Sequence, residues 1–438
     1  MISGKNALAH DAKTDAKTPE NGRRPLWAWL GPGLVTGASD DDPSGIATYS
    51  QVGAQYGYAL GWTMLFSFPL MAAIQEISGR IGRITGYGLA GNLRRHYPPV
   101  LLYGVVGLLL VANTLNLGAD LGAMGAALRL IVGGPDRLYA VVFGLFCAGL
   151  EIYVPYHRYA GVLKWLTLSL FAYVAVAFVV HVPWADIAWL ALVPGVRPDT
   201  LVSIVAVFGT TISPYLFFWQ AGQEVEELHD HHGKRALRRQ LKDAPSELRR
   251  IRLDTYVGMA FSNIIGFFII VAAGATLHEA GVTDIQTSAQ AAEALRPIAG
   301  PLTATVFAFG IVGTGLLAVP VLAGSAAYAV GEALKWRIGL DRRPREAKAF
   351  YATIAVATAI GAGLNFTAID PIKALFWCAV LNGVVAVPIM FVMMDMARRQ
   401  KIMGRLTASH ALLAVGWLAT AVMVVMVGAM FVMSFLGD

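Results

Sequence analysis

The chain has 438 residues, of which 56% are hydrophobic and only 14% carry a charge at neutral pH. A soluble domain of this length could not bury so much apolar chain, and repeated apolar runs reach the roughly 20 residues that span a bilayer. The composition therefore predicts an all-α polytopic membrane protein. No nucleophile, base and third polar group occur together outside the apolar runs, so we expect neither an enzyme nor a bound cofactor.

Hydropathy predicts about eleven transmembrane helices and no appended soluble domain. The first 24 residues are polar and lack the apolar core of a cleaved signal, so residues 1–24 are predicted to form a disordered cytoplasmic tail. The predicted spans lie near residues 27–53, 56–79, 98–133, 138–156, 159–181, 200–221, 255–277, 301–330, 350–367, 374–396 and 408–436.

Basic residues set the expected orientation. With the amino terminus inside, the tail and the inner loops hold roughly 29 of the 34 Lys and Arg residues, which matches the positive-inside rule. We therefore expect a multi-pass protein of the plasma (inner) membrane with a cytoplasmic amino terminus. The net charge of +6 then reflects topology in the lipid bilayer rather than nucleic-acid binding. His229, His231 and His232 of one inner loop could bind a metal ion, but a solvated linker is the favoured interpretation.

The segment Gly37–Gln51, GASDDDPSGIATYSQ, places three consecutive aspartates inside the first span. A charged residue at membrane depth costs about 2.5 to 3.5 kcal/mol on insertion scales, and a helix interior disfavours Pro and Gly. Such a segment needs an interior partner or a substrate, and we expect that substrate to be a divalent cation. Since adjacent helical positions point about 100° apart, Asp40, Asp41 and Asp42 are not expected to face one ion together.

A second interrupted span lies at Phe208–Glu227, FGTTISPYLFFWQAGQEVEE, where Pro214 falls in the middle of the sixth span. Pro43 and Pro214 thus break the first and sixth spans, which correspond if five helices are repeated as five. Two broken helices in matching places favour a transporter of inverted repeats with its site at the midplane, although Pro and Gly also kink ordinary membrane helices. The predicted parts are 25–181 for the first repeat, 200–396 for the second and 408–436 for the last helix.

The run GPGLVTGASDDDPSGIATYSQVGAQYGYALGW resembles the first helix of the NRAMP family of divalent metal transporters, and IGRITGYGLA resembles the end of its second helix. The resemblance implies a LeuT-type 5+5 inverted repeat with helices 1 and 6 broken. Carried over residue by residue, the family's metal-binding positions and the residues that support the two helix breaks fall on Asp42, Pro43, Ser44, Gly45, Thr210, Ser213, Pro214, Tyr215 and Gln220.

Several of these residues depart from the family pattern. Ser44 and Gly45 stand in place of Gly and the ligand Asn, Ser213 replaces the Met that supplies a thioether, and Tyr215 and Gln220 replace two histidines. Carboxylate, carbonyl and hydroxyl oxygens suit hard ions that keep part of their water. We therefore expect a site that favours Mg²⁺ and also accepts Mn²⁺, similar to the magnesium-transporting branch related to the family.

The proton route of the family is also altered. Its Asp and Glu of helix 3 fall on Asn116 and Ala119, with Asp120 one residue beyond as a possible proton route. We therefore predict transport that is uncoupled from protons. The alternatives are a proton-coupled symporter of Mn²⁺ or Fe²⁺, a carrier of a non-metal solute on the same scaffold, and a metal-sensing receptor that binds without flux.

Overall fold

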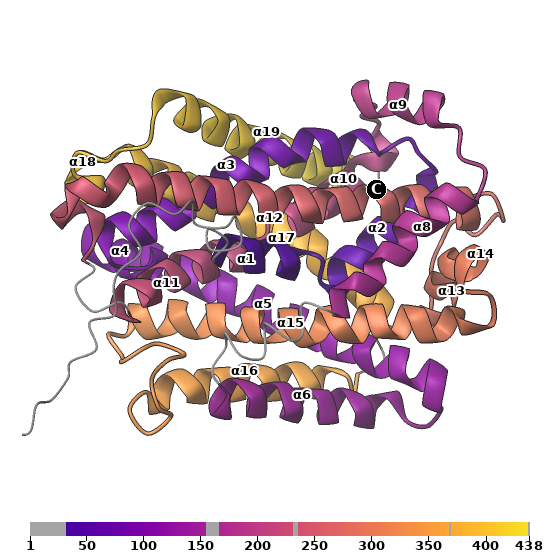
Figure 1. Cartoon of the computed structure of the whole chain (residues 1–438), viewed down its shortest axis with the longest axis horizontal. Helices are drawn as coiled ribbons and strands as arrows, with labels where there is room; N and C mark the ends of the chain where they lie inside the picture. The colour runs from indigo at the N-terminus through magenta and orange to yellow at the C-terminus, as the bar shows by residue number, and fades with distance from the viewer. Residues whose placement is uncertain (1–31, 155–165, 231–234, 368, 437–438) are drawn as a thin grey trace, which may run out of the picture.

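The computed structural model describes residues 32–154, 166–230, 235–367 and 369–436, and the described residues form helices with no strand (Figure 1). The predicted tail 1–24, His231 and His232 lie outside the described residues, as does the first part of the predicted span 159–181. The all-helical fold expected from composition is therefore confirmed for the part of the chain that is described.

In the described part of the chain, thirteen α-helices fall on the predicted spans, and five further α-helices lie between them. The first set is α1 (Pro32–Asp40), α2 (Pro43–Tyr56), α3 (Trp62–Thr85), α5 (Pro99–Val132), α6 (Asp136–Tyr153), α8 (Phe171–Val179), α10 (Leu201–Thr211), α11 (Pro214–Asp230), α12 (Ala244–Ala273), α15 (Thr303–Ala333), α16 (Lys348–Leu364), α17 (Pro371–Arg398) and α19 (His410–Leu436). The others are α4 (Leu89–His96), α9 (Trp184–Leu192), α13 (Ser288–Ala292), α14 (Arg296–Ala299) and α18 (Gln400–Met403).

Six described segments are long and apolar enough to cross a membrane on their own, and a bent pair containing α8 and α9 makes a seventh. The remaining predicted spans fall on helices that are shorter, broken or less apolar, so the count of eleven stays a prediction. The predicted span 56–79 begins six residues too early, because α2 ends at Tyr56 and a turn with positive φ at Gly57 precedes α3.

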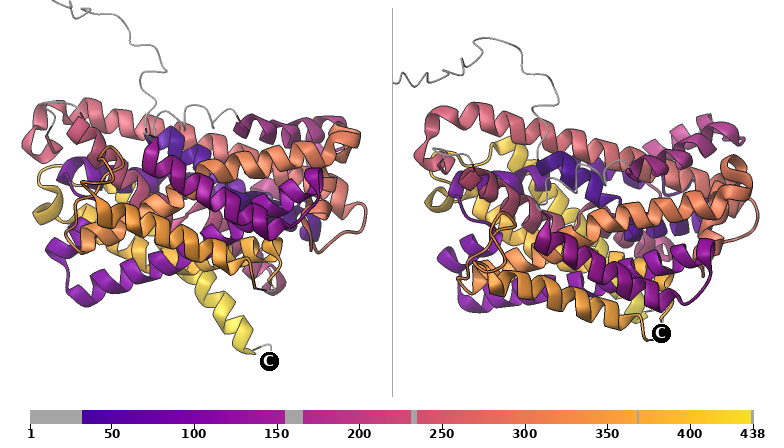
Figure 2. Two further views of the ribbon diagram at one scale, coloured as in Figure 1. Left: turned by 90° about the horizontal axis from the view of Figure 1, so that it is seen from below. Right: turned by 60° about the horizontal axis from the view of Figure 1, so that its bottom comes forward.

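Many of the helices pack in two groups, and the second group includes α1, α2 and α11 of the broken spans. One group contains α5, α6, α15 and α16, which contact one another, and the other contains α1, α2, α3, α11 and α12. In Figure 1, α1 and α2 lie between α12 above and α15 below. The left view of Figure 2 shows the end of α19 extending beyond the body of the other helices. The two broken helices are therefore held in the interior.

Close backbone contact fixes α10 against α17. A Cβ atom on Gly209 would lie 2.0 Å from the carbonyl oxygen of Ala379 and 2.5 Å from the amide nitrogen of Gly383, so only glycine fits there. Small residues allow such an approach between membrane helices. This contact lies immediately before the end of α10 and thus positions the residues that follow it.

A largely buried group of charges, which we call the ion cluster, joins α3, α11 and α12. It consists of Arg83, Glu224, Glu227, Glu247 and Arg250. The Arg83 side chain is 1% exposed and contacts a carboxylate oxygen of Glu247 at 2.5 Å, and Arg250 contacts one of Glu224 at 2.7 Å. The cluster ties α11 to two neighbouring helices, α3 and α12.

Candidate metal site

The two predicted breaks are confirmed at the residues that the prolines mark. Helix α1 ends at Asp40 and α2 begins at Pro43, while α10 ends at Thr211 and α11 begins at Pro214. Proline suits the first position of a helix because its missing N–H would have no partner there. Helix ends leave backbone carbonyl oxygens without intrahelical partners, so each break supplies oxygen atoms at membrane depth.

Asp42 lies between α1 and α2 and contacts three elements. Its Oδ1 accepts a hydrogen bond from the Gly45 backbone N–H at 2.7 Å and so caps α2. Its Oδ2 accepts from Asn116 Nδ2 of α5 at 3.3 Å and from the Tyr215 hydroxyl of α11 at 3.2 Å. The Tyr215 hydroxyl also lies 3.1 Å from the Ser39 carbonyl oxygen, at the end of α1. The carboxylate is therefore the point where the two broken spans meet.

Asp40 and Asp41 face α12 rather than Asp42. The Ser262 hydroxyl lies 2.6 Å from Asp40 Oδ2 and 3.0 Å from Asp41 Oδ1. The other oxygen of each carboxylate is buried without a hydrogen-bond partner among the described residues. All three aspartates are at most 2% exposed, and within the described chain none forms a salt bridge with Lys, Arg or His. This arrangement places three carboxyl groups side by side in the chain interior without a basic partner among the described residues.

Thr210, Ser213 and Gly45 lie around the same two breaks. The Ser213 hydroxyl donates to the carbonyl oxygens of Thr210 at 2.6 Å and Gly209 at 2.9 Å. The hydroxyl and the Thr210 carbonyl therefore lie together, and each oxygen keeps a lone pair for an ion. There is little free space at Gly45, since a Cβ atom there would lie 3.3 Å from the Asp40 carbonyl oxygen and from Thr210 Oγ1.

Two predicted residues form no hydrogen bond with Asp42 in the described part of the chain. Gln220 binds the neighbouring helices instead, because its Nε2 donates to Thr255 Oγ1 at 2.9 Å and its Oε1 accepts from Gln75 Nε2 at 2.6 Å. Asp120 of α5 is fully buried, and neither of its carboxylate oxygens has a hydrogen-bond partner in the described part of the chain. Gln220 therefore joins helices, whereas Asp120 is an unpaired acid within the membrane.

No group of three or more His, Cys, Asp or Glu side chains among the described residues is arranged to hold a metal ion. This agrees with the separation of Asp42, which contacts Asn116 and Tyr215, from Asp40 and Asp41, which contact Ser262. An ion at the breaks would be held by the Asp42 carboxylate together with backbone carbonyl and hydroxyl oxygens. Such a donor set leaves room for water in the coordination shell.

Sequence reasoning missed two polar residues. Ser262 contacts two of the three aspartates. In the sequence, its role is indicated only by the adjacent Asn263, with which it forms a polar pair inside an apolar span. Glu151 of α6 is 3% exposed, and both of its carboxylate oxygens lack a hydrogen-bond partner among the residues described. A lone Glu in an apolar run marks a functional candidate on its own.

Two discontinuous helices that meet at buried acidic residues inside a polytopic helical protein define the architecture of a secondary transporter. The profile of the family described as Natural resistance-associated macrophage protein-like matches residues 33–433. The chain belongs to this family.

Curated relatives match the chain over most of its length. The divalent metal cation transporter MntH of Klebsiella pneumoniae is 26% identical over 423 residues, which cover 95% of this chain and 96% of that protein. The divalent metal cation transporter MntH of Chromohalobacter salexigens is 26% identical over 322 residues, covering 69% of this chain and 70% of that protein. These relatives are named as transporters and not as enzymes.

Solved structures confirm the fold class. A manganese transporter of Eremococcus coleocola superposes with a TM-score of 0.72 at 16% identity, covering 98% of this chain and 92% of that one. Mhp1, a transporter of the nucleobase-cation-symport-1 family, superposes with a TM-score of 0.55 at 16% identity and covers 92% of this chain and 91% of its own. The expected LeuT-type architecture with two broken helices is therefore confirmed.

Proposed function

We propose that this protein transports divalent metal cations across the plasma (inner) membrane, with its amino terminus in the cytoplasm. The observation that carries the proposal is the set of three buried aspartates at the two breaks, with no basic residue paired to them in the described chain. Burying unpaired carboxylates is costly. A cation that enters the site offsets that cost, and relatives named for divalent metal transport support the same substrate class.

The donor atoms favour a hard ion. Asp42, the Thr210 carbonyl and the Ser213 hydroxyl offer only oxygen, and no thioether is among the residues proposed as ligands. Oxygen donors suit Mg²⁺ and Mn²⁺ better than soft ions such as Cd²⁺. We propose Mg²⁺ as the favoured substrate and Mn²⁺ as a second one, with Asp42, Gly45, Thr210 and Ser213 forming the binding site.

The membrane potential alone can drive this transport. A divalent ion gains about 4.6 kcal/mol per 100 mV on entering a negative cell, at about 2.3 kcal/mol per charge. The α5 residue that forms a hydrogen bond with Asp42 is the neutral Asn116. Its amide does not titrate, so it cannot take a proton from the Asp42 carboxyl group and pass it on to α5. We therefore propose uptake that is uncoupled from protons.

A specific observation supports the proton-coupled alternative. Asp120 on α5 and Glu151 on α6 are both buried with unpartnered carboxylate oxygens among the described residues. Within a membrane such groups commonly serve as proton relays. Proton symport acidifies the vesicle interior during metal uptake, whereas uncoupled uptake does not. A single measurement of lumenal pH therefore distinguishes the two modes.

The test is uptake of Mg²⁺, Mn²⁺ and Ca²⁺ into proteoliposomes that contain the purified protein, a potassium gradient and a pH-sensitive dye in the lumen. We expect potential-driven uptake of Mg²⁺ and Mn²⁺ with no change in lumenal pH, and no uptake in empty liposomes. Absence of flux for every divalent ion would overturn the proposed function. Lumenal acidification in proportion to metal uptake would replace uncoupled uptake by the symport alternative.

A further inference from the structure

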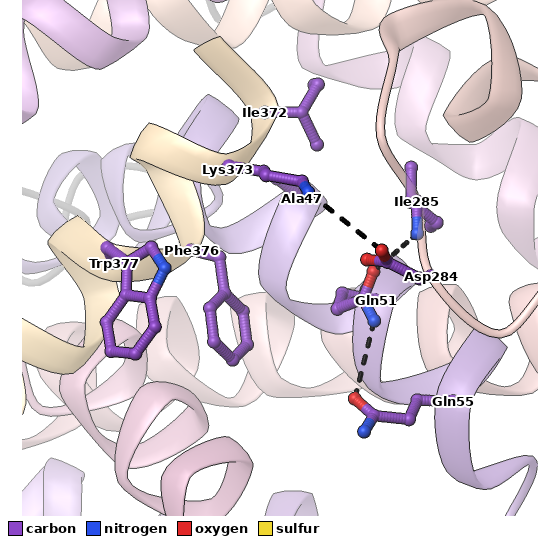
Figure 3. Close-up of a pocket in the computed structure, with 9 residues that line it drawn as sticks. All are labelled: Ala47, Gln51, Gln55, Asp284, Ile285, Ile372, Lys373, Phe376 and Trp377. Atoms are coloured by element: carbon purple, nitrogen blue, oxygen red, sulfur yellow. Dashed lines mark hydrogen bonds and ion pairs between the residues drawn. The ribbon is translucent and has the colours of Figure 1, made fainter. Parts of the chain in front are cut away.

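A cavity of about 220 Å³ lies between α2, α17 and the connection that precedes α13 (Figure 3). Its walls combine apolar side chains of α17 with the amides of Gln51 and Gln55, the carboxylate of Asp284 and the ammonium group of Lys373. None of these polar residues belongs to the metal site at the helix breaks. The cavity is therefore a separate polar space in the fold.

The cavity follows the metal site along α2. Ala47, Gln51 and Gln55 recur every four residues and thus lie on one stripe of the helix. At the inner end of this stripe the Ser44 hydroxyl donates to the Leu375 carbonyl oxygen of α17 at 3.1 Å. With a rise of 1.5 Å per residue, Gln51 lies about 10 Å further along α2 than Ser44. By the predicted topology, the cavity therefore lies toward the end of the helices opposite the basic inner loops.

The segment carrying Asp284 is fixed to α2 by the Gln51 amide. Gln51 Oε1 accepts from the Ile285 backbone N–H at 2.8 Å, and its Nε2 donates to the Thr283 carbonyl oxygen at 3.1 Å. Figure 3 shows the Gln51 side chain between Asp284 and Gln55, whose Oε1 also accepts from Gln51 Nε2 at 3.3 Å. Backbone bonds on both sides of Asp284 thus hold its carboxylate beside the cavity before any ion arrives.

Lys373 places a positive charge opposite this carboxylate. Its Nζ lies 3.9 Å from Asp284 Oδ2, and the two side chains are 50% and 59% exposed. An exposed pair at this distance is worth little and exchanges readily with other ions. By the predicted topology, Lys373 is one of only five basic residues at the outer end, the others being Arg129, Arg137, Arg197 and Arg296.

We propose that this cavity is an outer waiting site for a hydrated divalent cation, where Asp284 receives the ion and Lys373 is the tethered cation that the ion displaces. The inference rests on the proposed function and adds to it a first binding step. The size of the cavity fits a hydrated ion. Six waters at about 30 Å³ each occupy about 180 Å³, and the cavity has a volume of about 220 Å³. A hydrated ion can therefore bind here before it loses water at Asp42.

Removing the charge of Lys373 and removing the charge of Asp284 should change the KM for Mg²⁺ in opposite directions. Lys373→Gln removes the competing charge and keeps a polar side chain, so the KM for Mg²⁺ falls about threefold to tenfold at low ionic strength. Asp284→Asn removes the receiving charge at constant size, so KM rises by a similar factor. The maximal rate stays within about twofold in both variants, because the site at the breaks is unchanged.

The matched controls are Arg296→Gln and Glu293→Gln. These residues form an exposed ion pair of 3.0 Å at the same end of the protein, outside the cavity. Uptake is measured in proteoliposomes at about 0.01 M and about 0.5 M salt, because the Debye length falls from about 30 Å to about 4 Å over this range. The cavity variants should lose most of their effect on KM at high salt, and the controls should have little effect at either concentration.

Chemical modification gives a second readout within one folded protein. In a Lys373→Cys variant, a cationic methanethiosulfonate reagent restores the positive charge and should return KM toward the wild-type value. An anionic reagent should lower KM below that of the unmodified variant. Both native cysteines, Cys147 and Cys378, are buried, and the wild-type protein treated with each reagent is the control.

The outcomes separate the two proposals. If the wild type carries no divalent ion, the proposed function fails. If the wild type carries Mg²⁺ but the Lys373 and Asp284 variants match the controls at low salt, the waiting site is overturned and transport stands. Changes in KM that have the same sign for both residues, or that persist unchanged at high salt, also overturn it.

Discussion

Asp42 has two separable tasks, and two substitutions distinguish them. Its Oδ1 caps α2 through the Gly45 N–H, and its charge is the proposed ligand of the ion. Asn caps a helix about as well as Asp, whereas Ala loses a cap worth about 1 kcal/mol. Asp42→Asn should therefore abolish metal uptake without loss of stability, and Asp42→Ala should abolish uptake and destabilise the protein by about 1 kcal/mol.

The surroundings of Asp42 can accept the amide. Asn116 donates to the present carboxylate through Nδ2, and its Oδ1 has no partner among the described residues. If the Asn116 amide turns over, it offers an acceptor to the new NH₂ group while the Gly45 bond remains.

Uptake in proteoliposomes and thermal unfolding of the purified protein measure the two tasks separately. A loss of about 1 kcal/mol corresponds to about 2 °C or less at this chain length, so replicate melting curves of the two variants are compared directly. Wild-type uptake by Asp42→Asn would refute the ligand assignment. Equal melting temperatures for the Ala and Asn variants would refute the capping argument.

Three further predictions concern selectivity, protons and stability. Ser213→Met combined with Gly45→Asn should shift the preference from Mg²⁺ toward Mn²⁺ and Cd²⁺, because a thioether favours soft ions; competition uptake measures this, and an unchanged order of ions would contradict it. The crowding at Gly45 means that the single Ser213→Met variant is the cleaner comparison. Metal uptake should leave lumenal pH unchanged in the wild type and in Asp120→Asn; a proton influx lost in that variant would instead identify Asp120 as a relay. Arg83→Ala should destabilise the protein by about 3 kcal/mol, since it leaves buried Glu224 with one basic partner fewer; an unchanged melting temperature would contradict this.

The breaks were predictable because proline and aspartate have local effects. Proline lacks a backbone N–H and favours the first position of a helix, and the structure places Pro43 and Pro214 there. The helical angle between adjacent residues does not explain the directions of the aspartates, because Asp41 and Asp42 lie in the break itself and Asp40 and Asp41 both contact Ser262. Local rules therefore sufficed for the position of the candidate site along the chain.

The partners of the site depend on packing between distant segments, which local rules do not supply. Ser262 lies more than 200 residues from Asp40, yet its hydroxyl lies 2.6 Å from that carboxylate. The pairing of Gln51 with Thr283 and Ile285 is similarly distant in sequence. Gln220 illustrates the reverse case, because a position implied by family resemblance contacts Gln75 and Thr255 rather than Asp42.

The cap on α2 links ion binding to the geometry of the break. Asp42 Oδ1 accepts from Gly45 N–H, and Oδ2 accepts from Asn116 and Tyr215, so both oxygens already have partners in this structure. An incoming ion can share an oxygen with these donors or displace them, and displacement at Oδ1 leaves the first turn of α2 without its cap. The same helix carries Gln51, which lines the cavity and holds the Asp284 segment, so loss of the cap would loosen the first turn of the helix that forms one wall of the cavity. Binding at Asp42 and access from the cavity are therefore properties of one short helix.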